Sequence, residues 1–389
     1  DISHRSSQVA EHAARKAVWE RREPELVQGP HSVDHEPLTF PLRTSSVPKG
    51  PIEKYVDAAA IGSLAAVGVA LGATRNPRRS ADLLLTGVPK AANLGREAFA
   101  AHLDRSLANR GVLVMDPAAL RRFDRVDTLV LDAHLLVSGT WSIDRLELVD
   151  PDADLTTSTA RARALLRAKD PTARRTRGSW VLQPFKADDR APRGSQALAR
   201  RLAKGGRKSL GLWRGDRLMA VVAVSEDPMA LVEQVVSSAR DAGLEVILAG
   251  GNDALAERIG GVARWVTSRL EEEVRRHQDA GHCVMLASGR AHAALRTADV
   301  GIGVEQPGHR IPWGAHLVVP PGHGAVWVVV DAVARARAVS ARSARFALAG
   351  ATSGGAWAFV GPGRLAARRI MLPVNAAALA SMAYGAYSG

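Results

Sequence analysis

Cysteine and aromatic residues are scarce in this chain of 389 residues. The single cysteine, Cys283, excludes an internal disulfide and a metal site built from several thiolates, and it fits a reducing compartment. Aromatic residues make up 4% of the sequence and do not alternate with basic ones, so a surface that stacks nucleic-acid bases is not indicated. We therefore expect no nucleic-acid partner.

Lysine is also rare, although the chain is strongly basic. Of the 52 basic residues 44 are Arg and 8 are Lys, and the formal net charge is +13. Together with abundant Ala, this preference indicates a compositional bias, so the charge says little about the partner. The first residues are polar and charged, and we expect no signal peptide. The chain starts at Asp1 and ends in an apolar stretch at Gly389, and we expect it to be a piece of a longer protein.

Three runs without any charged residue lie towards the two ends of the chain, at 58–74, 346–363 and 370–389. The first holds 17 residues, at the lower limit of the roughly 17–25 residues that span a bilayer. Arg residues flank the two C-terminal runs, as they do at the ends of membrane helices. Two interpretations stay open here: helices in a membrane, or Ala-rich core helices of a soluble protein.

The middle of the chain alternates short apolar, β-branched runs with segments of helical period. Examples are the runs DTLVLD (127–132) and EVILAG (245–250) and the charged amphipathic segment SRLEEEVRRHQDAG (268–281). This alternation predicts parallel βαβ units and an open α/β sheet. The active crevice of such a sheet lies at the carboxyl ends of its strands, which is where Asp132 falls.

Three stretches resemble the cytoplasmic phosphorylation domain of the P-type cation-transporting ATPases, which has a haloacid-dehalogenase-like fold. They are NRGVLVMDPAALRRFDRVDTLVLD (109–132), which ends where the family has its phosphorylated Asp, then EVILAGGN (245–252) and LRTADVGIGV (295–304). Pro89 interrupts an apolar run upstream, as the family's membrane-helix proline does. The resemblance covers roughly residues 55–389, and it is strongest to the large mycobacterial-type ATPases in which one half of the chain is a degenerate copy of the pump.

The resemblance breaks at the residues that carry the chemistry. Where the family has DKTGT, this chain has Asp132 followed by Ala-His-Leu-Leu, so the Lys and Thr that hold the phosphate are absent. Phosphoryl transfer depends on positioning and on charge stabilisation, and leucines supply neither. Asp132 therefore marks the position of the phosphorylated Asp, and we predict that it is inactive.

The second phosphate motif and the lysine of the family have changed as well. The family's TGD corresponds to Gly250, Gly251 and Asn252, with an amide in place of the carboxylate. The lysine falls near Leu270, next to Arg269. We predict that Gly250, Gly251, Asn252 and Arg269 are the degenerate remains of a phosphate site.

The metal-binding motif of the family has lost its acids. Its GDGxND corresponds to ASGRAHAAL (287–295), which contains Arg290 and no carboxylate. Because Mg²⁺ bound beside a phosphate usually needs one or two carboxylates, we expect no metal in this segment. The resemblance implies Mg-ATP for the family, but we expect no cofactor here.

Three histidines are candidates for catalysis or metal binding. His134 is followed by two leucines and is expected to be structural. His282 and His292 flank a predicted strand, and the side chain of neighbouring Cys283 should point to the opposite face from His282. No further partner stands at ligand spacing, so the sequence predicts no metal site there.

The resemblance implies an α/β fold: a haloacid-dehalogenase-like (Rossmannoid) parallel-sheet domain with a reduced nucleotide-domain insert, flanked by transmembrane helices. We expect a polar, Pro-rich linker with one short helix at 1–55, a membrane-helix pair and stalk at 56–110, the phosphorylation-like domain at 111–145 and 217–343, the insert at 146–216, and membrane helices at 344–389.

The function implied by the resemblance is that of a module of a P-type cation-transporting ATPase in the cell membrane, with its α/β domain in the cytoplasm. The lost motifs predict a catalytically degenerate module with a structural or regulatory role, whose partners are an intact ATPase half or subunit and membrane lipids. The cation is not indicated. Two alternatives stay open: a divergent haloacid-dehalogenase-like phosphatase or ATPase that uses Asp132 with Arg269 and Arg290 as charge clamps, and a soluble basic α/β binding protein.

Overall fold

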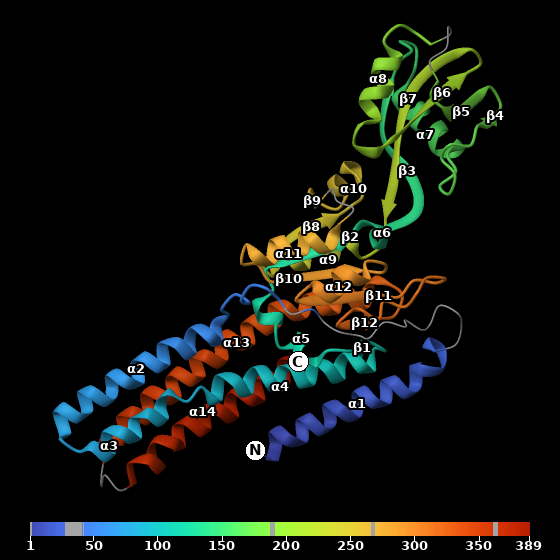
Figure 1. The fold of residues 1–389 in the computed structure, drawn as a ribbon. Helices are drawn as coiled ribbons and strands as arrows, with labels where there is room; N and C mark the ends of the chain where they lie inside the picture. The colour runs from blue at the N-terminus through green and yellow to red at the C-terminus, as the bar shows by residue number, and fades with distance from the viewer. Residues whose placement is uncertain (1, 28–40, 42, 187–190, 266–268, 361–364) are drawn as a thin grey trace. The chain divides into compact units, whose positions relative to one another are not determined.

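The computed structural model describes residues 2–27, 41, 43–186, 191–265, 269–360 and 365–389 (Figure 1). The Pro-rich part of the expected linker around Pro30 and Pro37 lies outside these residues.

The helices and strands alternate along the chain much as the sequence predicts. The helices are α1 (Ile2–Leu26), α2 (Pro51–Thr74), α3 (Pro77–Asp82), η1 (Leu83–Gly87), α4 (Lys90–Asn109), α5 (Pro117–Leu120), η2 (Phe123–Arg125), α6 (Ala133–Leu136), α7 (Leu155–Leu165), α8 (Ser195–Leu202), η3 (Lys204–Gly206), α9 (Val232–Asp241), α10 (Asp253–Arg258), α11 (Leu270–Asp279), α12 (His292–Thr297), α13 (His323–Ala358) and α14 (Ala366–Ser388). The strands are β1 (Leu113–Val114), β2 (Thr128–Asp132), β3 (Val137–Leu148), β4 (Arg175–Arg177), β5 (Trp180–Pro184), β6 (Lys208–Arg214), β7 (Arg217–Pro228), β8 (Glu245–Ala249), β9 (Ala263–Trp265), β10 (Val284–Ser288), β11 (Val300–Val304) and β12 (Leu317–Val319).

The chain divides into two compact units. Unit 1 holds residues 1–130, 237–246 and 269–389, and unit 2 holds residues 131–236 and 247–268. The chain passes from one unit to the other within β2, α9 and β8.

A seven-stranded sheet has the order β1-β12-β11-β10-β2-β8-β9. Strand β10 pairs in parallel with β11, β11 with β12, and β8 with β9, whereas β1 joins the edge in antiparallel. Strands β2, β10 and β11 are buried along their whole length. Continuous apolar runs of this kind are typical of parallel strands covered on both faces. The predicted open, parallel α/β sheet is therefore confirmed.

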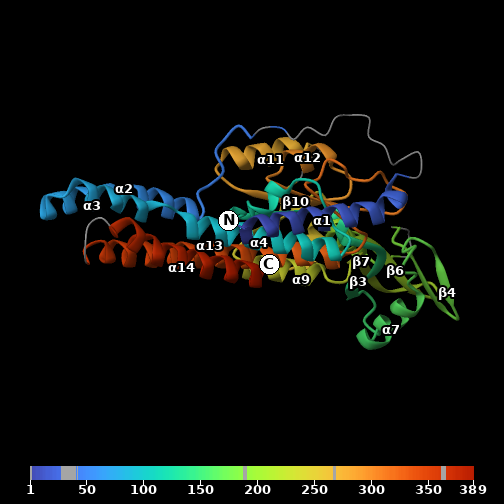
Figure 2. The same ribbon diagram turned by 90° about the horizontal axis from the view of Figure 1, so that it is seen from below.

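The long helices α2, α4, α13 and α14 of unit 1 lie side by side in both views (Figures 1 and 2). Three of them meet where their residues are small. A Cβ atom on Gly95 of α4 would overlap the side chains of Ser343 and Ser381, and a Cβ atom on Gly385 would overlap the backbone oxygen of Gly95. Small residues let helix backbones approach this closely, which is the usual way in which helices pack within a membrane.

Helices α2 and α14 are long and apolar enough to cross a bilayer, by length and composition. They correspond to the first and last charge-free runs of the sequence. Their apolar side chains face outwards: Ile61 and Val69 of α2 are 72% and 73% exposed, and Leu379 of α14 is 61% exposed. A core helix of a soluble protein buries most such side chains, whereas these lie on the surface of the described bundle.

The short helix expected within residues 1–55 is the 25-residue helix α1, which packs along α4. Val18 and Leu26 are buried, and one guanidinium nitrogen of Arg22 donates to both carboxylate oxygens of Glu305, at 2.6 and 2.7 Å. Pro24 lies within the last turn of α1. The sequence did not predict the full length of this helix. A few buried side chains, together with ion pairs, hold α1 in place, so its hydrophobic periodicity is weak.

Unit 2 contains a five-stranded antiparallel sheet of order β3-β7-β6-β5-β4. Helix α7 covers one face through Ala162 and Leu165, and α8 covers the other through Ala199 and Leu202. Strands β3 and β7, which begin and end this part of the chain, have 12 residues each and form the longest ladder of the sheet. The sheet thus extends beyond the expected insert of 146–216 at both ends.

We expect Gly385→Ala to destabilise the helix bundle, because the new methyl group meets the backbone of α4 rather than a movable side chain. Overpacking of this kind costs roughly 1–3 kcal/mol. Thermal unfolding of the full chain in detergent measures the effect. The matched control is Gly72→Ala in α2, where a Cβ atom meets nothing within 4 Å. An equal melting temperature for both variants would contradict the close approach at Gly95.

Candidate functional site

Asp132 lies at the carboxyl end of β2 and is also the N-cap residue of α6. Its side chain is 7% exposed, and Oδ1 accepts a hydrogen bond of 3.1 Å from the backbone N–H of His134. A carboxylate at this position satisfies a helix N–H group that otherwise has no partner. The structure thus gives Asp132 a local structural role at the position where the family has its phosphorylated residue.

The leucines that follow Asp132 in the sequence belong to the buried core. Leu135 and Leu136 are 5% and 3% exposed, and the carbonyl of Leu136 accepts a hydrogen bond of 2.7 Å from the N–H of Met229. The His134 side chain is exposed to solvent. Two buried aliphatic side chains therefore occupy the stretch in which the family has Thr and Gly.

The loop with Gly250, Gly251 and Asn252 lies beside Asp132 in unit 2. A Cβ atom on Gly251 would come within 2.8 Å of the Cβ atom of Ala133, so only glycine allows this approach. Gly250 and Gly251 both have positive φ angles, of 74° and 65°, which glycine adopts without strain. The structure therefore places the Gly250–Asn252 loop against Ala133, the residue that follows Asp132.

Two polar groups of this loop have partners in the neighbouring elements of unit 2. The N–H of Gly250 donates to the carbonyl of Trp265 at 2.9 Å, and Oδ1 of Asn252 accepts from the N–H of Leu255 at 2.8 Å as the N-cap of α10. The Gly250 N–H and the Asn252 Oδ1 are thus engaged with β9 and α10.

Arg264 is a residue next to this loop that the sequence did not single out. Its guanidinium donates to the carbonyl of Gly251 at 2.8 Å and pairs with Asp253 at 2.7 Å. One Arg among 44 gives no signal in the sequence, because its position in β9 becomes informative only when β9 pairs with β8. Arg264 holds the loop in place through its backbone.

Two further arginines fasten α10 to the antiparallel sheet within unit 2. Arg258 donates to Asp227 at 2.8 Å, to Ser225 Oγ at 2.9 Å and to Ser142 Oγ at 3.2 Å. Because it reaches both β3 and β7, it holds the two strands at the point where they leave the phosphorylation-like part.

Arg207 makes a similar link from the end of η3. It forms ion pairs with Asp144 of β3 and Glu257 of α10, and its side chain is 6% exposed. Burial acts to lower the pKa of Arg207, but the hydrogen bonds to the two carboxylates outweigh it and raise the pKa. Arg207 thus links β3 to α10 through one ion pair to each element.

The remaining predicted positions lie in unit 1. Arg269 precedes α11, is exposed, and pairs with Glu272 at 3.1 Å. Ser288 ends β10, and its Oγ accepts from the N–H groups of Arg290 and Ala291 at 3.2 and 3.0 Å. The Arg290 side chain is exposed. A hydroxyl group therefore caps the turn where the family has its metal-binding carboxylates.

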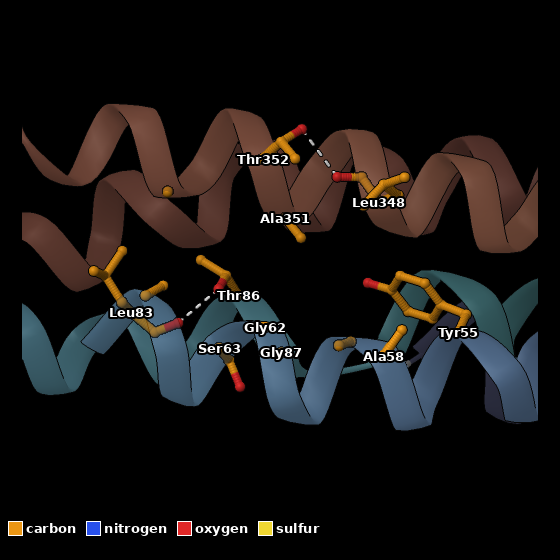
Figure 3. A pocket seen from close by; sticks show the side chains of 13 residues that line it. Tyr55, Ala58, Gly62, Ser63, Leu83, Thr86, Gly87, Leu348, Ala351 and Thr352 are labelled. Atoms are coloured by element: carbon orange, nitrogen blue, oxygen red, sulfur yellow. Dashed lines mark hydrogen bonds between the residues drawn. The ribbon is translucent and has the colours of Figure 1, made fainter. Parts of the chain in front are cut away.

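An apolar cavity of about 400 Å³ lies between α2, η1 and α13 in unit 1. Figure 3 shows Tyr55 and Ala58 of α2 on one side and Leu348 and Thr352 of α13 on the other. The hydroxyls of Thr86 and Thr352 donate to the carbonyls of Leu83 and Leu348 at 2.6 and 3.0 Å. The described residues that line the cavity include no acid and no amide.

No protein-family model matches the chain. Two curated proteins, each named Probable cation-transporting ATPase I, align with the whole chain: the protein of Mycobacterium tuberculosis (strain CDC 1551 / Oshkosh) at 29% identity and that of Mycobacterium leprae (strain TN) at 30% identity. The chain spans 26% and 27% of their lengths, about a quarter.

Two solved structures share its fold. Crystal structures of a zinc-transporting PIB-type ATPase in two different states superpose with TM-scores of 0.52 and 0.51, at 17% and 16% sequence identity. The alignments cover 88% and 86% of this chain and 64% and 62% of the ATPase.

The chain is homologous to part of a P-type cation-transporting ATPase. The resemblance read from its motifs is confirmed, as is the α/β fold class. In this chain Asp132 and the Gly250–Asn252 loop follow strands β2 and β8, and both make hydrogen bonds within the local fold.

We expect Arg258→Ala to loosen the insert, because Asp227 is left half-buried without its cation. Hydrogen bonds to charged groups contribute about 1.5–3 kcal/mol each. Hydrogen exchange of β3 and β7 in the full chain measures the loss of protection. The control is Arg145→Ala, whose ion pair with Glu257 joins two side chains that are 57% and 55% exposed and should contribute little. Equal exchange rates in the two variants would contradict the prediction that Arg258 stabilises β3 and β7.

Proposed function

We propose that this chain is a module of a P-type cation-transporting ATPase which forms no acyl phosphate and acts through its structure. The observation that carries the proposal is the environment of Asp132: its carboxylate caps α6, and the next turn places Leu135 and Leu136 in the core. A phosphorylated Asp needs donors and cations around the incoming phosphoryl group. Buried leucines in that stretch supply neither.

The residues do not fit the Mg-ATP that the family implies. The stretch 284–298, which corresponds to the metal motif, contains no Asp or Glu, and the Ser288 hydroxyl is engaged by two backbone N–H groups. In nucleotide sites Mg²⁺ is usually bound by one or two carboxylates together with the phosphates of the substrate. We therefore assign no catalytic step to this segment.

The fastening of the insert supports a structural or regulatory role. Arg258 and Arg207 tie α10 to β3 and β7 through ion pairs within unit 2. A sheet held in this way presents a fixed surface. We propose that this surface docks on an intact ATPase half or subunit, because the curated relatives are about four times as long as the aligned segment.

The cell membrane is the proposed location, with the α/β domain on the cytoplasmic side. The outward-facing apolar side chains of α2 and α14 support contact with lipid, and their helices have the length of a span. The transported cation is not assigned.

Acyl-phosphate formation tests the proposal directly. The full chain is reconstituted in membranes and incubated with γ-labelled ATP and Mg²⁺, beside Asp132→Asn and an intact P-type ATPase as a positive control. We expect no label that hydroxylamine removes. Label that is present in the native chain and absent in Asp132→Asn would refute the proposal and would support the divergent active enzyme instead.

A further inference from the structure

The amino ends of β2, β8 and β10 lie next to one another in unit 1. The N–H of Asp127 donates to the carbonyl of Cys283 at 3.0 Å, and the N–H of Glu245 donates to the carbonyl of Asp127 at 2.9 Å. These backbone bonds fix three neighbouring positions, so the side chains of Asp127, Glu245 and His282 emerge at the same edge of the sheet. This edge is opposite to the strand ends that carry the degenerate phosphate motifs.

The end of α11 adds a second imidazole to this edge. Gly281 has a φ of 97°, its N–H donates to the carbonyl of Gln278, and the N–H of His282 donates to the carbonyl of His277. This pair of bonds is the Schellman motif, which brings the second residue after the cap back against the last helical turn. The rings of His277 and His282 consequently stack, with centroids 4.2 Å apart.

We infer that Glu245, His277 and His282 form a binding site for a divalent transition-metal ion of the zinc type. One ligand atom from each residue lies within 4.8 Å of the others, and Nε2 of His277 is 3.8 Å from Oε2 of Glu245. Two imidazoles and one carboxylate are a common protein ligand set for Zn²⁺, with a fourth position left to water. The site revises the sequence-based expectation that His282 has no metal partner.

Binding of an ion requires the ligand atoms to move closer together and the two rings to rotate. With Zn–N and Zn–O bonds of about 2.0–2.2 Å, two ligand atoms on a tetrahedral ion are roughly 3.4 Å apart. The ion lies in the plane of each imidazole that binds it, so the stacked rings, now 21° from parallel, must rotate. The room exists, because the side chains of Glu245 and His282 are 52% and 41% exposed.

Asp127 serves as a positioning residue for His282. Its Oδ1 lies 3.4 Å from Nδ1 of His282 and accepts hydrogen bonds from the N–H of Cys283 and from Oγ1 of Thr128. A carboxylate next to one ring nitrogen holds the proton there and leaves the other nitrogen for the metal. Two cations lie nearby and are engaged by other groups: Arg337 donates to the carbonyls of Val126 and Ala242, and Arg43, paired with Asp299, donates to the carbonyl of His282.

Metal titration of the purified full chain tests the site. After treatment with a chelator, Zn²⁺ binding is measured by calorimetry at pH 7.5. Co²⁺ is used in parallel, since its visible absorption reports tetrahedral coordination. We expect one ion per chain with a tetrahedral Co²⁺ spectrum, and loss of both signals in His277→Gln, in His282→Gln and in Glu245→Gln.

Two further variants separate the roles of the residues. Asp127→Asn should keep the Co²⁺ spectrum but weaken binding roughly 10- to 100-fold; a lower melting temperature of the metal-free chain with unchanged affinity would remove its positioning role. The control is His309→Gln, an exposed loop histidine, which should bind as the native chain does. Zn²⁺ binding that is unchanged in the three ligand variants would overturn the site.

Discussion

The continuous backbone of α13 is the constraint on which the rest of unit 1 depends. This helix has 36 residues, which corresponds to about 54 Å at 1.5 Å per residue. Its first half carries a buried stripe that includes Val326, Val329 and Val333, and its second half packs against α14 at Gly350 and Gly354. Because α13 is one continuous helix, it connects the helix bundle of unit 1 to the strands next to Arg337.

Arg337 connects this helix to the amino edge of the sheet. It donates to the carbonyls of Val126, just before β2, and Ala242, just before β8. Burial lowers the pKa of Arg337, and the neighbouring charge of Asp127 acts to raise it. Asp127 thus compensates a half-buried cation, accepts the N–H of Cys283 and faces His282. The amino ends of β2, β8 and β10 are consequently held by the polar contacts of Arg337 and Asp127. These contacts do not involve Asp132 or the Gly250–Asn252 loop.

The sequence predicted the elements whose signal is local. The strands β2, β10 and β11 are short apolar runs, and the turn after α11 has its glycine at position 281, so both could be read without the fold. The positions of Asp132 and the Gly250–Asn252 loop followed from family motifs at strand ends.

The contacts that depend on tertiary structure gave no such signal. Glu245 is separated from His277 by 32 positions, and only the neighbouring ends of β8, β2 and β10 bring them together. In the sequence Arg258 and Arg264 could not be distinguished from the other arginines. Their roles depend on residues that only the fold brings next to them. Periodicity also said little about α1, since its contacts are ion pairs such as Arg22 with Glu305 and only a few buried side chains.

The two leucines that follow His134 have a physical consequence for the stability of the fold. Burying a leucine side chain stabilises a protein by about 1.5–3 kcal/mol, so Leu135 and Leu136 add stability where polar phosphate-binding groups would not. Functional sites are commonly strained or under-packed, and their loss often stabilises the fold. Asp132 is different, because replacing an N-cap carboxylate costs about 0.5–2 kcal/mol. Its presence at the end of β2 is therefore explained by capping α6, and chemistry is not required to account for it.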